Sequence, residues 1–268
     1  MTKAIAELIE RIAMIDWSTR HPSMKINSNG WAAHDTREAA KKNAVLELIE
    51  RDAVLANWFT QTPFGEIDHS TVPIDLRLWV VDELSRSEFP RLRLLLSTQG
   101  LGPSVTCLLV NSDGHGVSGH ATSSTLKESV SSAISEACRA AQMTLRKDHW
   151  LESIALRDRS DEQVSPGAHA VYYAYHEAFP EWIFGKTTSW YLANEQWTDR
   201  ISKVDFDAFD FCEVITEPMV VGFASHPSIL PLRWGTTCSD SDVAETLNRR
   251  QLNLGYVRDI NLHPHIVA

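Results

Sequence analysis

Two long stretches with helical spacing, set among short strand-like apolar runs, constrain the fold of this chain most strongly. The first covers residues 35–58, where Asp35 or Thr36 is suited to be the N-cap. The second covers residues 124–146. Strands are expected at residues 92–97, 105–111, 211–216 and 219–224. Because strands and helices alternate without regular βαβ spacing, we expect an α+β fold in which a mixed or antiparallel sheet packs against long helices.

The remaining segments give weaker signals. Pro63 and Gly65 favour a loop over residues 60–72. Residues 171–175 fit either a strand or the start of a helix, and residues 181–205 allow no assignment. Further helices are expected at residues 1–16, 73–87 and 240–252, and residues 151–167 are expected to be an exposed excursion.

Composition narrows the class of protein. The chain has 268 residues and a net charge of −10, which argues against a nucleic-acid-binding surface. Its four cysteines form no C-x-x-C pair, and no apolar run approaches the roughly 20 residues needed to span a bilayer. The N-terminus lacks the apolar segment of a signal peptide. We therefore expect a cytoplasmic protein with no membrane contact.

The pentapeptide Glu-Leu-Ile-Glu-Arg occurs twice, at residues 7–11 and 47–51. In a helix the second copy places Glu47, Glu50 and Arg51 on one face. Two carboxylates one turn apart can share a divalent cation, and the arginine suits a phosphate oxygen. The alternative is an ordinary solvated helix surface with a Glu47–Arg51 ion pair.

A second constellation lies in the later long helix, where Ser132, Glu136 and Arg139 share one face. Together with residues 28–30 and the first constellation, they supply the groups of a nucleoside-triphosphate site. In such sites carboxylates hold Mg²⁺ and arginines neutralise phosphates.

These residues carry a resemblance to a known family. Residues 26–33, 36–39 and 44–53 resemble the central signature of the YcaO family. Later stretches fit as well, at residues 114–142, 168–174, 231–235 and 263–265. The resemblance implies a single YcaO-like domain over residues 1–268, with the usual N-terminal part shortened.

The resemblance implies an ATP-dependent enzyme that phosphorylates a backbone amide oxygen of a peptide or protein, leading to an azoline or a thioamide. ATP and Mg²⁺ are the implied cofactors. Partners would be the peptide and a leader-peptide-binding, dehydrogenase or sulfur-transfer subunit, and a homodimer is a further expectation. The implied metal ligands are Glu47, Glu50 and Glu136, with Glu7 and Glu10 as further candidates; the implied nucleotide contacts are Ser28, Arg51, Ser132 and Arg139.

The chain also departs from the family pattern. No Gly-Lys-Gly stretch precedes residues 7–11, so this copy is either the family's first acidic helix or a coincidental repeat. Arg139 stands where glutamine is usual, and His34-Asp35 where Gly-Asn is usual. An added Asp35 carboxylate should weaken triphosphate binding unless a metal compensates.

Two other hypotheses therefore stay open. One is a degenerate YcaO-like subunit that binds a peptide or partner without hydrolysing ATP. The other is an unrelated α+β enzyme whose acidic helices form structural ion pairs. The glycines at 114, 116 and 119 are read as turn chemistry rather than a phosphate cradle, because the P-loop pattern is absent. Among the histidines, His169 lies in a stretch that resembles the family.

Overall fold

The computed structural model describes residues 29–77, 88–144, 148, 150–151, 153–154, 166–230 and 240–250. The expected helix at residues 1–16 lies outside this part, as do most of the 151–167 excursion and of the expected helix at 73–87. None of the described helices combines the length and the apolar composition that crossing a bilayer requires.

The described strands form two sheets. The larger sheet has the order β5-β4-β3-β2-β6, and the smaller has the order β1-β8-β7. Within the larger sheet β2 pairs with β6 in parallel and all other pairs are antiparallel. Their bounds are β1 Trp31–His34, β2 Phe64–Ile67, β3 Arg91–Leu96, β4 Val105–Val110, β5 Gly116–Ala121, β6 Phe184–Thr188, β7 Asp210–Ile215 and β8 Val220–Ser225.

Five α-helices and three short 3₁₀ turns have both ends in the described part of the chain, and residues 74–77 and the described residues between 148 and 154 are also helical. The helices are α3 Arg37–Phe59, α5 Leu126–Met143, α7 Pro166–Tyr175, α8 Trp190–Ser202 and α9 Asp240–Arg249, and the turns are η1 His69–Thr71, η2 Glu181–Ile183 and η3 Phe206–Ala208. The side chains of Thr36 and Thr125 cap α3 and α5 by accepting hydrogen bonds from backbone N–H groups in the first turn. This arrangement confirms the predicted α+β class with mixed sheets and long helices.

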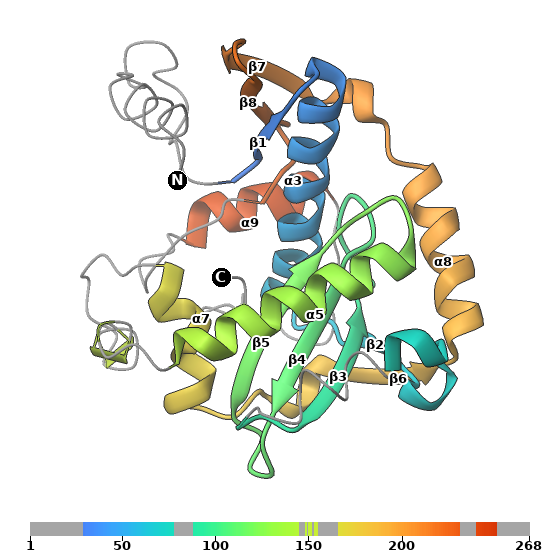
Figure 1. Ribbon diagram of the computed structural model, residues 1–268, viewed down its shortest axis with the longest axis vertical. Helices are drawn as coiled ribbons and strands as arrows, with labels where there is room; N and C mark the ends of the chain where they lie inside the picture. The colour runs from blue at the N-terminus through green and yellow to red at the C-terminus, as the bar shows by residue number, and fades with distance from the viewer. Residues whose placement is uncertain are drawn as a thin grey trace.

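The larger sheet is covered on both faces, which explains why β4 is apolar along almost its whole length. Leu94, Leu96 and Leu109 face α5, which crosses one side of the sheet in Figure 1. Leu95 and Leu108 face the second half of α3 on the other side. The strand period of two therefore divides the sheet's side chains between two helices.

Helix α3 connects the two sheets. Its first half, with Val45 and Ile49, packs against Ala224 of β8, whereas its second half packs under the larger sheet. Figure 1 shows α3 running from the small sheet toward the large one. The middle of α3 therefore lies where the edges of both sheets approach each other, and the acidic motif is in this middle part.

Three expectations from sequence were wrong or incomplete. The predicted loop at 60–72 contains β2, because pairing with β3 and β6 outweighs its Pro63 and Gly65 signals. Residues 171–175 belong to helix α7, and the unassigned residues 181–205 contain η2, β6 and α8. Tertiary packing decided each of these.

Candidate active site

Helix α3 presents an acidic face between the two sheets. Glu47 and Arg51 are one turn apart and form an ion pair, with Nε and Nη2 of Arg51 each 3.1 Å from Oε1 of Glu47. Both side chains are mostly buried, with 24% of the Glu47 and 13% of the Arg51 side chain exposed. A backbone N–H of Trp31 in β1 also donates to Glu47. The ion pair of the alternative hypothesis is thus present, but it is not a solvated surface pair.

Glu50 and Glu136 come from different helices and meet at the edge of the large sheet. The backbone N–H of Thr122 donates to Oε2 of Glu50 at 3.2 Å, and that of His120 donates to Oε2 of Glu136 at 2.6 Å. Since β5 is an edge strand, these N–H groups point away from β4. The edge of β5 therefore joins a carboxylate of α3 to one of α5.

Electrostatics couple these carboxylates. Burial, together with the charges of Glu136 and Glu47, raises the pKa of Glu50 to about 8, although Arg51 opposes this. Burial also raises the pKa of Glu47 and of Glu136, and Arg51 and Arg139 partly offset the shift at Glu136. Buried acids with raised pKa values beside charged groups are common at functional sites.

The donor set suits a hard divalent cation such as Mg²⁺, which prefers carboxylate oxygens. A cation would relieve the repulsion that Glu136 and Glu47 exert on Glu50. In the described residues, however, no three His, Cys, Asp or Glu side chains are close enough to hold one ion together. The assignment of Glu47, Glu50 and Glu136 as metal ligands therefore stays a prediction.

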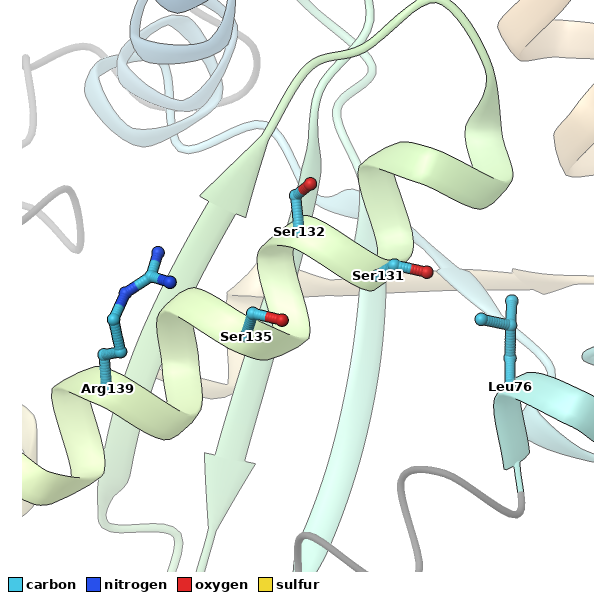
Figure 2. Close-up of a pocket in the computed structure, with 5 residues that line it drawn as sticks. All are labelled: Leu76, Ser131, Ser132, Ser135 and Arg139. Carbon is cyan, nitrogen blue, oxygen red and sulfur yellow. The ribbon is translucent and has the colours of Figure 1, made fainter.

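The two predicted nucleotide contacts on α5 lie beside an open pocket with a volume of about 500 Å³. Figure 2 shows the hydroxyls of Ser131 and Ser135 directed toward Leu76, whereas Ser132 and Arg139 extend from another side of α5. Arg139 also acts electrostatically on Glu136. Among the described residues, no carboxylate lines the pocket, and only Arg139 links it to the acidic cluster through its effect on Glu136. The lining offers hydroxyl and guanidinium donors, which fit phosphate oxygens.

The sequence also singled out Ser28, Glu7, Glu10 and Asp35. Ser28, Glu7 and Glu10 lie outside the described residues. Asp35 is exposed at the start of α3, about 18 Å along the helix from Glu47 by the rise per residue. The effect expected from its charge stays a prediction.

The glycine-rich segment is a turn only in part. Gly114 has a φ of +82° in the turn before β5, as turn chemistry requires, but Gly116 and Gly119 lie inside the strand. The turn is at the opposite end of β5 from His120, about 20 Å away by the strand rise. His169 is buried in α7.

Sequence reasoning missed Asp52 and Thr122. Asp52 is fully buried and accepts hydrogen bonds from the backbone N–H groups of Leu101 and Leu230 and from Arg250. Its position among the apolar residues of α3, after Ile49 and before Ala53, is a signal that could have identified it. No sequence signal identifies a backbone donor such as that of Thr122.

The raised pKa of Glu50 makes protein stability depend on pH. Between its ordinary value of 4.5 and about 8, the folded protein binds a proton that the unfolded chain has released. Stability should therefore fall as pH rises through this range, by up to about 1.4 kcal/mol per pH unit. Glu50→Gln should flatten this dependence and make the protein more stable than the wild type near pH 8, but not below pH 4.5. Urea unfolding with a chelator present measures this, and equal pH slopes would contradict it.

Comparisons with known proteins identify the family of this chain. The chain matches a family model described as "YcaO cyclodehydratase, ATP-ad Mg2+-binding" over residues 18–209. No curated protein matches it. Among solved structures it is similar to a "Heterocyclase in complex with substrate and Cofactor", with a TM-score of 0.54 and 15% identity, covering 81% of this chain and 30% of that chain.

Two further solved structures are similar at lower scores. The heterocyclase TruD has a TM-score of 0.48 and 20% identity, covering 81% of this chain and 31% of that chain. The YcaO protein from Methanopyrus kandleri bound with AMPPCP and Mg²⁺ has a TM-score of 0.49 and 15% identity, covering 78% and 58%. The chain thus spans less than two thirds of the length of each structure.

The family's description names ATP and Mg²⁺, so the cofactor prediction is confirmed at the level of the family. The hypothesis of an unrelated α+β enzyme is wrong. Because the matching region covers well over half of the chain, the protein belongs to the YcaO family.

Proposed function

We propose that this protein uses ATP and Mg²⁺ to activate a backbone amide oxygen of a peptide or protein, as a cyclodehydratase does. The amide oxygen takes the γ-phosphoryl group, a neighbouring Cys, Ser or Thr side chain attacks the amide carbon, and the oxygen departs with phosphate. The observation that best supports this proposal is the convergence of Glu50 from α3 and Glu136 from α5 at the edge of β5.

The residues of the site have separate roles in this proposal. Glu47, Glu50 and Glu136 would each supply a carboxylate to the Mg²⁺ bound with the nucleotide, and the metal would supply positive charge to the phosphates. Arg51 and Arg139 neutralise phosphate oxygens, and Ser132 donates a hydrogen bond beside them. Because phosphoryl transfer demands little covalent chemistry from the protein, positioning and charge neutralisation provide most of the catalysis.

The substrate and partners follow from the same proposal. One heterocyclase of similar fold has been solved with its substrate. We propose that the present chain likewise acts on a peptide or protein, as a subunit of a peptide-modifying complex. A side-chain nucleophile gives an azoline, whereas an external sulfide from a sulfur-transfer partner gives a thioamide.

Calorimetry with Mg-ATP tests the nucleotide site. We expect wild-type protein to bind, and Glu50→Gln to weaken binding about 100-fold, because a metal ligand and its charge are lost. Glu66→Gln is the matched control: Glu66 pairs with Arg93 on strands β2 and β3, three strands away from β5. Equal affinities for wild type and Glu50→Gln would remove Glu50 from the site.

A second candidate function is peptide or partner binding without ATP turnover. It is favoured by the ion pair between Glu47 and Arg51, which occupies one carboxylate, and by the lack of a three-ligand group among the described residues. Peptide binding without any heat from millimolar Mg-ATP, with or without a partner, would support it over the enzyme.

A further inference from the structure

At the outer edge of β5, backbone N–H groups donate to carboxylates, which take the place of the carbonyl groups that a further strand would supply. His120 and Thr122 are two residues apart, so their N–H groups point to the same side, away from β4. These groups donate to Glu136 and Glu50 respectively. Because alternate residues of a strand are about 7 Å apart, the two acceptor oxygens are held at a similar spacing.

The side chains of His120 and Thr122 form hydrogen bonds toward β4, on the side away from the two carboxylates. The hydroxyl of Thr122 donates to the carbonyl of Pro103 at 2.9 Å, just before β4 begins. Nδ1 of His120 lies 3.0 Å from Oγ1 of Thr106 in β4. All three side chains are buried, with Thr122 only 7% exposed. His120 and Thr122 therefore each bond a carboxylate through the backbone N–H, and each bonds β4 or the residue before it through the side chain.

We infer that Thr122 and His120 are positioning residues for the carboxylate cluster. Their side-chain bonds fix the end of β5, so that the outward N–H groups of His120 and Thr122 hold Glu136 and Glu50 in place for binding a metal–nucleotide complex. This inference rests on the proposed function and adds two residues, Thr122 and His120, that act through the ligands without contacting the metal.

The loop before β4 supports this role, because it is itself fixed by buried groups. Asp52 of α3 accepts from the N–H of Leu101, and Arg200 of α8 donates to the carbonyls of Gln99 and Gly102. The Pro103 carbonyl that receives the Thr122 hydroxyl therefore belongs to a rigid support. The hydrogen bond from the Thr122 hydroxyl to this carbonyl therefore restrains the position of Thr122, and the Thr122 N–H in turn restrains Glu50.

Thr122→Val tests the inference, since valine keeps the shape and the backbone N–H but removes the hydroxyl. We expect the affinity for Mn²⁺ alone, measured by paramagnetic resonance, and for Mg-ATP, measured by calorimetry, to fall about 10-fold. Thr122→Ser retains the donor and should bind within twofold of the wild type. Thr106→Val removes the partner of His120 and should weaken binding in the same direction.

Thr60→Val is the matched control for loss of a buried hydroxyl. Oγ1 of Thr60 donates to the carbonyl of Ala56 at 2.6 Å, and the residue is 1% exposed. It lies at the end of α3, about 15 Å along the helix from Glu50. Thr60→Val should lower thermal stability as Thr122→Val does, yet leave both affinities unchanged.

The outcomes separate the inference from the proposed function. If wild type binds Mg-ATP and Thr122→Val binds Mn²⁺ and Mg-ATP equally well, the positioning role is wrong and the nucleotide site stands. Equal losses of affinity in Thr122→Val and Thr60→Val would also overturn it, because general destabilisation would then explain both. If wild type binds neither probe, the proposed function fails and the positioning role fails with it.

Discussion

Replacement of Arg250 by methionine is expected to lower the free energy of unfolding by about 3–5 kcal/mol, because it leaves a buried carboxylate without its cation. Nη1 of Arg250 lies 2.6 Å from Oδ1 of Asp52, and the two side chains are 7% and 0% exposed. Asp52 would keep two backbone donors, Leu101 and Leu230, which cannot neutralise its charge. Urea unfolding followed by tryptophan fluorescence measures the change.

Arg249→Met is the matched control in the same helix turn. Arg249 is 48% exposed, and it pairs with Glu245 one turn earlier and donates to the carbonyl of Pro227. Its loss should cost less than about 1 kcal/mol, as for other exposed pairs. Adding Asp52→Asn to Arg250→Met should recover part of the loss, since the uncompensated charge is then gone. If Arg250→Met and Arg249→Met lowered the free energy of unfolding equally, the buried pair would stabilise the protein no more than the exposed one.

Substitution of Gly119 by alanine is expected to cost about 3 kcal/mol or more, at the upper end for overpacking. An added Cβ would lie under 3.0 Å from backbone atoms of Ala133 and Ala137, so helix α5 would have to move away from β5. Glu136 precedes Ala137, so this movement would also break its hydrogen bond from the His120 N–H. We therefore expect a lower unfolding midpoint together with weaker Mg-ATP binding.

Gly65→Ala is the control for the change from glycine to alanine within a strand. A Cβ at Gly65 would have its nearest contact with the carbonyl oxygen of Leu96 at 3.8 Å, an ordinary van der Waals distance. Because glycine loses more conformational freedom on folding, this variant should be neutral or more stable by less than about 1 kcal/mol. If Gly119→Ala were as well tolerated, the close packing of α5 on β5 would be contradicted.

The long helices were predictable because their signals are local. The caps, Thr36 for α3 and Thr125 for α5, lie within a residue of the predicted starts. Strand β2 was not predictable, since four residues containing Gly65 form a strand only when β3 and β6 pair with them from both sides. Residues 171–175 combine valine and tyrosines that suit either structure, and burial against the core decided for helix.

The candidate site shows the same division. By itself the sequence determined that Glu47, Glu50 and Arg51 share one helix face and that Ser132, Glu136 and Arg139 share another, because helical periodicity is a local property. Only the tertiary structure brought Glu50 and Glu136 together, through N–H groups at the edge of β5. Backbone donors are the same for every non-proline residue, so their use depends on where the chain folds them and leaves no mark in the sequence.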